Sequence, residues 1–324
     1  MTVYRLQTRT AGGKISKYCL ENKVLAMGWS LTDKTRKESN IPLNRWKSIE
    51  RYTDYEKIID EFKPYGSSRV NHNIVRLKNL NKNDLVWLRD NGSYYLGRIT
   101  SEKALWRYVS TPQVLELDVA NQVTDIDWIK IGGESSVPGC VTTSFIQGHT
   151  LQKINKNGVQ EVSEFLYNMY SKTKTYKINY CKNTLDSFYS FISPTDCEDL
   201  LCLWLYFTRG YIAIPSTNKK ATELYECVLI NPKNGMHIYP QVKNGNKPIN
   251  LDADNYTTIE IENKKYEVWL LTVNGVVKNA EKYDYIHVAD KETLYNFVNS
   301  PEGKTILPPS ILMWKDFFST KAQY

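Results

Sequence analysis

The chain lacks several features that would assign it to a familiar class. It has no apolar run near the roughly 18 residues of a membrane span, and its first residues, MTVYRLQTRTAGGK, contain no apolar core of the signal-peptide kind. Its six cysteines form no Cys-x-x-Cys pair and its four histidines show no ligand spacing, so we expect no zinc site. We expect a cytoplasmic protein with no membrane partner, whose thiols act as small apolar residues.

Charge is unevenly distributed along the 324 residues. Residues 1–155 hold 23 of the 42 basic and 16 of the 35 acidic side chains, which gives a net charge of +7. The remaining 169 residues hold 19 of each and are neutral. A basic surface attracts nucleic acid, although the same excess can simply keep a protein soluble.

The length and the order of apolar segments predict two domains joined by a helix. Short β-branched and aromatic segments separated by turn residues, with one helix over 45–63, predict a small mixed β-barrel in residues 1–155. Among its expected strands are 73–79 and 140–146. A connecting helix is expected in 156–182, and residues 183–324 predict an α/β domain with a mixed sheet. There, Ser193 or Thr195 is expected to cap a helix that ends at Gly210.

Polar side chains occupy unexpected places in the segment YECVLINPKNGMHIYPQVKNG, residues 225–245. Asn-Pro-Lys-Asn-Gly between two apolar runs predicts a hairpin. Gln241 and Lys243 are two residues apart on a strand and therefore share a face, and the hairpin would bring Glu226 beside them. Glu198 lies on the preceding helix. Carboxylate and neutral oxygen ligands suit Mg²⁺, and a lysine can position a water, but an edge strand also carries such residues merely for solvation.

The order helix-Glu, strand-Glu and Gln-x-Lys resembles the PD-(D/E)xK nuclease superfamily, and most closely its Mrr-like restriction endonucleases, over about residues 185–318. The resemblance implies that Glu226 and Gln241 bind Mg²⁺ or Mn²⁺ together with the carbonyl of Val242. It implies that Lys243 positions the water and that Glu198 holds a second ion or an outer-shell water. Glu226 stands where the family has Asp in a glycine-rich turn, so an inactive nuclease fold is the alternative.

The first half resembles EVE domains of the PUA/YTH-like group. The matching elements, in order, are Gly28–Trp29, Asp84–Val86, Gly97–Ile99, Trp106–Arg107–Tyr108 and Asp127–Trp128. The resemblance implies a pocket for a flipped or modified base, which needs aromatic faces and polar edges. The residues expected to form this pocket are Trp29, Ser30, Trp106 and Tyr108. Arg98 and Arg107 are expected to hold phosphates. Tryptophans in a small barrel can instead be core, as we expect for Trp87 and Trp128.

These expectations combine into a modification-dependent DNA endonuclease of restriction or phage defence. Its first domain would read a modified base, most simply a modified cytosine, in double-stranded DNA. Its second domain would cut the DNA with Mg²⁺, and two subunits would pair to cut both strands. The alternatives are an inactive nucleic-acid-binding protein and a sensor of a small signalling ligand. The sequence does not decide which modification is read, or between DNA and RNA.

Overall fold

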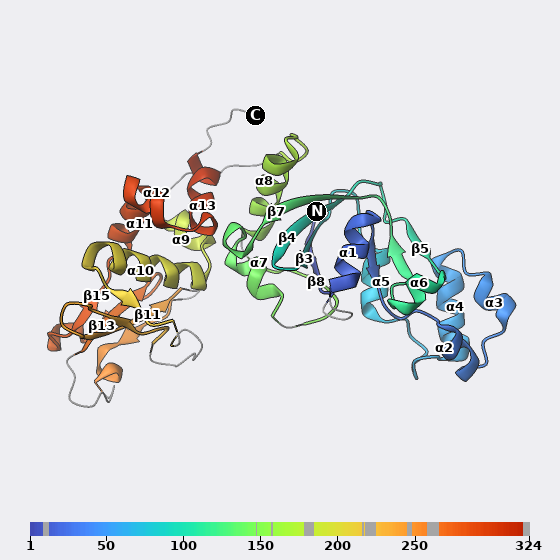
Figure 1. Ribbon diagram of the computed structural model, residues 1–324, viewed down its shortest axis with the longest axis horizontal. Helices are drawn as coiled ribbons and strands as arrows, with labels where there is room; N and C mark the ends of the chain where they lie inside the picture. The colour runs from blue at the N-terminus through green and yellow to red at the C-terminus, as the bar shows by residue number, and fades with distance from the viewer. Residues whose placement is uncertain are drawn as a thin grey trace. The chain divides into compact units, whose positions relative to one another are not determined.

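Two units make up the chain, and the computed structural model describes residues 1–8, 13–146, 148–156, 158–177, 185–215, 217, 225–244, 248–257 and 266–319 (Figure 1). The side chains of residues 135, 143, 187, 190, 191 and 315–319 are not described. Unit 1 comprises Met1–Val137 and Val141–Ile178, and unit 2 comprises Pro138–Cys140 and Asn179–Tyr324. Helix α7 (Gly139–Ser144) covers the segment at which the division falls.

Unit 1 contains two separate sheets. Its strands are β1 (Val3–Leu6), β2 (Leu25–Met27), β3 (Leu85–Asp90), β4 (Ser93–Ile99), β5 (Trp106–Tyr108), β6 (Asn121–Val123), β7 (Ile126–Gly132) and β8 (Leu151–Lys153). One sheet has the order β7-β4-β3-β1-β8, with β1 parallel to β3 and the other pairs antiparallel, and the second has the order β2-β6-β5. The predicted closed barrel is wrong for the described residues, because β7 and β8 end the larger sheet without pairing with each other.

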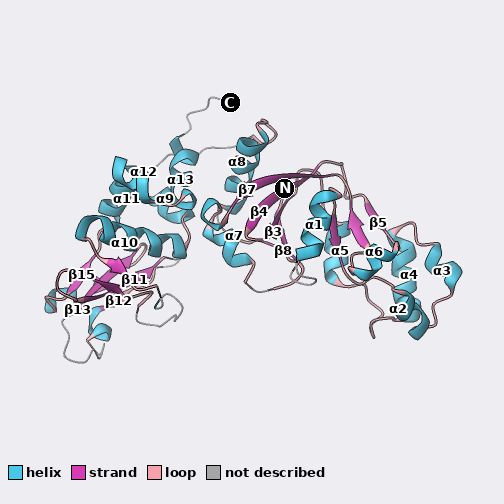
Figure 2. Ribbon diagram, in the orientation of Figure 1, coloured by secondary structure: helices cyan, strands magenta, loops and turns pink. Residues whose placement is uncertain are grey.

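Helices surround these sheets (Figure 2). They are α1 (Lys14–Glu21), α2 (Asp33–Glu38), α3 (Leu43–Lys47), α4 (Tyr52–Phe62), α5 (His72–Lys78), α6 (Pro112–Glu116) and α8 (Val159–Ser171). The strand predicted at 73–79 is the helix α5, because the Asn71 side chain accepts from the Asn73 amide at its start, and Ile74 and Leu77 bury one helical face. The strand predicted at 140–146 is also wrong, since α7 occupies most of it.

Helix α8, from the segment expected to connect two domains, is part of unit 1. It packs on β7 and β1, and the indole nitrogen of Trp87 donates to Ser163 Oγ at 3.0 Å. Both side chains are fully buried, which confirms Trp87 as a core residue. Trp128 is only partly buried and packs against the core cluster that contains Val86 and Leu88. Its ring lies over Gly97, where an added Cβ would be 2.6 Å from the indole.

Unit 2 is built on a mixed five-stranded sheet of order β15-β13-β11-β10-β9. Its strands are β9 (Ile212–Ala213), β10 (Leu229–Ile230), β11 (His237–Lys243), β13 (Tyr266–Thr272) and β15 (Ile286–Val288), with β12 (Leu251–Asp252) and β14 (Val277–Lys278) forming a small parallel pair. The β9, β10 and β11 strands form an antiparallel meander, whereas β11, β13 and β15 are parallel. The mixed sheet predicted for the second half is therefore present.

Helix α10 (Pro194–Arg209) lies against β11 (Figure 1). Ser193 Oγ accepts from the Asp196 amide at its start, and Gly210 ends it at φ +69°, which confirms Ser193 as the cap and Gly210 as the stop. The other helices of the unit are α9 (Leu185–Phe191), α11 (Lys291–Asn299), α12 (Pro301–Ile306) and α13 (Pro309–Ser319). In the part of the chain that the structure describes, no helix combines the length and the apolar character needed to cross a membrane.

Candidate functional site

The β10–β11 hairpin brings the predicted polar residues of unit 2 together. Its turn is closed by hydrogen bonds from Asn231 N–H to the Met236 carbonyl at 2.8 Å and from Gly235 N–H to the Asn231 carbonyl at 2.8 Å. Gly235 adopts φ +71°, a conformation that glycine reaches at little cost. Before β10 begins, Glu226 N–H still bonds the Pro240 carbonyl at 3.0 Å, so the acid lies directly beside Gln241.

Glu226, Gln241 and Lys243 converge on one carboxylate oxygen. Gln241 Nε2 donates to Glu226 Oε1 at 2.8 Å, and Lys243 Nζ lies 3.7 Å from the same oxygen. Gln241 is fully buried, whereas the side chains of Glu226 and Lys243 are 21% and 34% exposed. The amide at the bottom of the cluster is therefore buried, whereas the carboxylate and the ammonium above it can be reached by solvent or by a substrate.

Glu198 on α10 belongs to the same electrostatic neighbourhood. Burial, and then the nearby charges of Glu226 and Asp199, raise the pKa of its carboxyl to about 7, with the Lys243 charge acting in the opposite direction. A carboxyl with this pKa holds a proton part of the time near neutral pH. A cation bound near both acids would reduce the cost of holding them both ionised.

The backbone of β11 adds an oxygen on the same side. Successive carbonyls of a strand point to opposite neighbours. Pro240 offers its carbonyl to Glu226 N–H, and Lys243 offers its carbonyl to Val273 N–H on the β13 side at 3.0 Å. The Val242 carbonyl therefore points to the Glu226 side, while the Val242 side chain is buried on the other face.

The residues present fit a hard divalent cation. Gln241 Oε1 is buried without a hydrogen-bond partner among the described residues, and a buried amide oxygen of this kind is costly unless something binds it. Oxygen ligands are what Mg²⁺ and Mn²⁺ prefer. Within the described ranges no three His, Cys, Asp or Glu side chains are arranged so that they alone could hold a metal ion, so amide and carbonyl oxygens would have to complete the set.

Two cysteines beside this cluster escaped the sequence analysis. Cys202 lies four residues after Glu198 on α10, Cys227 follows Glu226, and their sulfur atoms are 3.5 Å apart as free thiols. The signal was the i, i+4 spacing on the helix, which places Cys202 on the face of Glu198.

A cavity of about 640 Å³ opens in unit 1. Of the residues expected to form a base pocket, Trp29 and Ser30 line it. Trp29 adopts φ +59°, which is rare for a bulky residue, and its carbonyl accepts from Tyr55 Oη at 2.9 Å. Asn121 Nδ2 donates to the Gly28 carbonyl at 2.8 Å, and Asp118 Oδ1 accepts from Ser30 N–H at 2.9 Å. Side chains from three other segments thus hold the turn that presents the indole.

Trp106 and Tyr108 lie elsewhere, in an aromatic cluster next to the core. Trp106 packs edge-on against Tyr52, with ring centres 5.6 Å apart. Tyr108 stacks on Tyr55 at 5.6 Å, and its hydroxyl accepts from Leu31 N–H at 2.7 Å. Neither is among the described lining residues of the cavity, and the described contacts of these two rings are with Tyr52, Tyr55 and the Leu31 amide.

Sequence reasoning missed two residues at the cavity, Tyr65 and Asp118. Tyr65 also lines a second cavity of about 300 Å³ that shares Trp29 with the first. Both residues lie in loops far from Trp29 in sequence, and no spacing pattern connects them to it.

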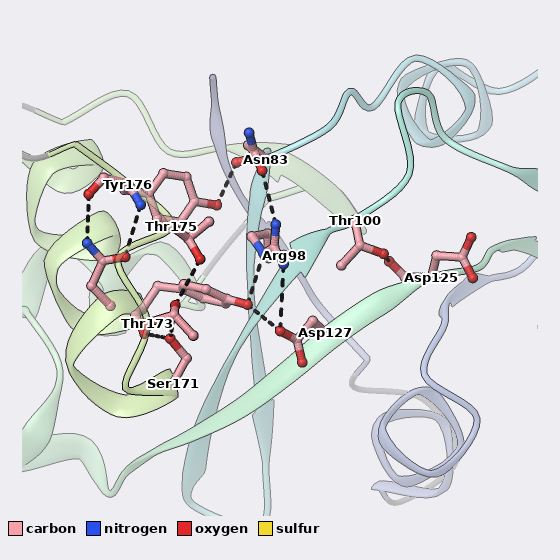
Figure 3. A network of polar contacts seen from close by, with 11 residues as sticks. Asn83, Arg98, Thr100, Asp125, Asp127, Ser171, Thr173, Thr175 and Tyr176 are labelled. Carbon is pink, nitrogen blue, oxygen red and sulfur yellow. Dashed lines mark hydrogen bonds and ion pairs between the residues drawn. The ribbon is translucent and has the colours of Figure 1, made fainter.

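The two arginines expected to contact phosphates are engaged with protein groups. Arg98 donates to Tyr167 Oη at 2.9 Å and to Asn83 Oδ1 at 3.2 Å, and its guanidinium lies 4.0 Å from Asp127 (Figure 3). Tyr167 donates in turn to Asp127, so this network fastens α8 to the sheet. Arg107 is exposed but donates twice to Gln122 Oε1, at 3.1 and 2.9 Å. Neither lines the 640 Å³ cavity among its described residues.

Comparison with known proteins adds no assignment. No protein-family model matches the chain, and no curated protein matches it.

Proposed function

We propose that the chain is a divalent-cation-dependent DNA endonuclease, in which unit 2 hydrolyses phosphodiester bonds and unit 1 reads a modified base, most simply a modified cytosine. The observation that carries the proposal is the convergence of Glu226, Gln241 and Lys243 at the partly exposed end of two adjacent segments of the hairpin. Apolar side chains at these three positions would stabilise the sheet at least as well as the polar ones do. A charged pair over a buried amide is therefore better explained by a catalytic role than by a contribution to stability.

Each residue of the cluster has a role in this hydrolysis. Glu226, the amide oxygen of Gln241 and the carbonyl of Val242 would hold Mg²⁺ or Mn²⁺, with Glu198 binding a second ion or a coordinated water. When bound, the cation would polarise the scissile phosphate. The Lys243 ammonium would orient the attacking water and offset the negative charge that grows on the phosphate oxygens in the transition state.

The reading role of unit 1 is supported by its cavity and by its charge. A volume of about 640 Å³ lies in the range of about 300–1,000 Å³ that is usual for small-ligand sites, and one wall is the Trp29 indole. A base taken out of its stack needs such an aromatic face. The +7 charge of residues 1–155 favours the phosphate backbone as partner. Subunits would pair to cut both strands.

A cleavage panel tests the proposal. The purified protein is incubated with Mg²⁺ or Mn²⁺ and with unmodified, methylated, hydroxymethylated or glucosylated DNA, and products are separated on a gel. We expect cuts in at least one modified DNA and far fewer in unmodified DNA. Lys243→Ala should abolish cutting while leaving DNA binding intact, because the lysine acts in unit 2 and the base is read in unit 1.

One observation favours a second candidate, an inactive reader on a nuclease fold. Gln241 Nε2 already donates to the Glu226 carboxylate, and this arrangement satisfies the acid without a metal. If wild-type protein binds a modified DNA tightly but cuts none with either metal, this reading replaces the endonuclease.

A further inference from the structure

Two adjoining cavities in unit 1 share Trp29 and Tyr65 as a common wall but differ in charge. Of the described residues that line the larger cavity, Asp118 is the only charged one. The described lining of the smaller cavity includes Arg69 and His72 and contains no acid. Asp118, Tyr65 and Arg69 are all solvent-exposed, and Tyr65 is 40% exposed, so the residues that would select a ligand stand at the openings.

The position of the Asp118 carboxylate is fixed by the turn that carries Trp29. Its Oδ1 accepts from Ser30 N–H, and its Oδ2 lies so close over Gly28 that an added Cβ would be 2.7 Å away. An ionised carboxylate has about four acceptor sites, so it can still accept from a ligand. A carboxylate matches the exocyclic amino group of a base, as with cytosine N4, and repels a phosphate.

The geometry points to a divided nucleotide site. A base that carries an exocyclic amino group enters the larger cavity beside Trp29, and Asp118 accepts a hydrogen bond from that amino group. The phosphate of the same nucleotide stays outside, next to Arg69. This inference rests on the proposed reading of nucleic acid by unit 1, and it names the edge of the base that is read and the residue that holds the backbone.

Binding to four labelled DNA duplexes tests the inference. Each duplex carries one central nucleotide opposite an abasic site, so that no base pair has to be broken. The central base is 5-methylcytosine, thymine, N4,N4-dimethylcytosine or cytosine. Thymine shares the ring and the methyl group of 5-methylcytosine but replaces its amino donor with an oxygen acceptor. N4,N4-dimethylcytosine keeps the cytosine ring and has no N4–H. We expect wild-type protein to bind 5-methylcytosine about tenfold more tightly than thymine, and cytosine about tenfold more tightly than N4,N4-dimethylcytosine.

Two variants separate the two halves of the site, and a third serves as control. Asp118→Asn keeps an oxygen for Ser30 N–H and removes the charge, and it should bring the preference for 5-methylcytosine over thymine close to one. Arg69→Gln should weaken binding to every duplex by the same factor and lower the slope of log Kd against log salt by about one, without changing that preference. Lys130→Gln, an exposed change on β7 away from both cavities, serves as control and should change neither quantity.

The outcomes distinguish this inference from the proposed function. If duplexes bind but wild-type protein prefers thymine, or treats all four bases alike, the role of Asp118 is wrong while nucleic-acid binding stands. The comparison with the dimethyl base needs only wild-type protein, so it decides the point even if Asp118→Asn fails to fold. If Arg69→Gln leaves the salt slope unchanged, the backbone contact is wrong. If no duplex binds at low salt, the proposed reading function fails and the inference with it.

Discussion

Replacing Glu198 with glutamine should stabilise the metal-free protein at neutral pH. Burial, and then the charge of Glu226, raise the pKa of this half-buried carboxyl from 4.5 to about 7. The folded state therefore binds the proton more tightly than the unfolded chain does. The resulting stabilisation is fully present below pH 4.5, the unfolded value, and is lost as the pH rises through about 7. Above that pH, the folded protein holds an ionised carboxylate in an unfavourable place.

The size of the effect follows from the same shift. A rise from 4.5 to about 7 corresponds to about 3 kcal/mol of unfolding free energy at pH 8. Glutamine has almost the same shape and no charge, and because the Glu198 side chain is only partly buried, solvent screens part of this electrostatic cost in the wild type. We therefore expect Glu198→Gln to raise the free energy of unfolding by about 1–3 kcal/mol at pH 8, and by about 1 kcal/mol or less at pH 5.

Urea unfolding at the two pH values, with a chelator present, measures this difference. Glu116→Gln changes an exposed carboxyl of unit 1 and serves as control, with no gain expected at either pH. Adding excess Mg²⁺ should then stabilise wild-type protein more than Glu198→Gln, because the ion joins the two acids. A variant that is no more stable than wild type at pH 8 would refute the raised pKa of Glu198, and equal stabilisation by Mg²⁺ would remove Glu198 from the cation site.

Three further predictions concern contacts that the structure defines. Ser163→Ala leaves the buried Trp87 indole N–H without its acceptor, so urea unfolding should show a loss of about 1–3 kcal/mol, whereas Ser68→Ala at an exposed position should show almost none. Gly97→Ala forces a Cβ to within 2.6 Å of the Trp128 ring and should lower the free energy of unfolding by about 1–3 kcal/mol. Gly133→Ala, where nothing lies within 4 Å of the added Cβ, should leave it nearly unchanged. Equal losses in the two variants would contradict the close packing of Trp128 on Gly97. Oxidised glutathione should convert the Cys202 and Cys227 thiols into a disulfide, with release of two reduced glutathione molecules, visible as a cross-linked peptide by mass spectrometry. Cys202→Ser should prevent it, and failure of the wild-type pair to cross-link would mean that the sulfur atoms do not meet.

The geometry of the unit 2 cluster could be predicted because it depends on short-range rules. The two-residue period of a strand puts Gln241 and Lys243 on one face, and the Asn-Pro-Lys-Asn-Gly turn fixes the strand that lies next to them. The caps of α10 are equally local, since Ser193 and Gly210 act within one helical turn. These features need no knowledge of the rest of the fold.

The cavity of unit 1 depends on contacts between distant segments, and there the predictions were only partly right. The local sequence around an aromatic residue on a short strand does not show whether its ring faces a ligand or the core. Trp106 and Tyr108 face an aromatic cluster because α4 brings Tyr52 and Tyr55 against them. Asp118 and Tyr65 reach the cavity from loops, whose course no local pattern predicts. The prediction of a barrel was wrong because the order of the strands decides whether a sheet closes, and hydrophobic periodicity does not reveal that order.

The attachment of α8 to the first sheet determines how the two units can be separated for study. A cut after residue 155 would remove the helix, and with it Ser163, and would expose the apolar surface of Trp87 that is fully buried in the intact chain. The chain just beyond α8 is needed too, since Tyr176 donates to the Asn83 carbonyl and Asn168 holds the Tyr176 backbone. A fragment ending near residue 178 keeps these contacts, and one ending near residue 155 should aggregate.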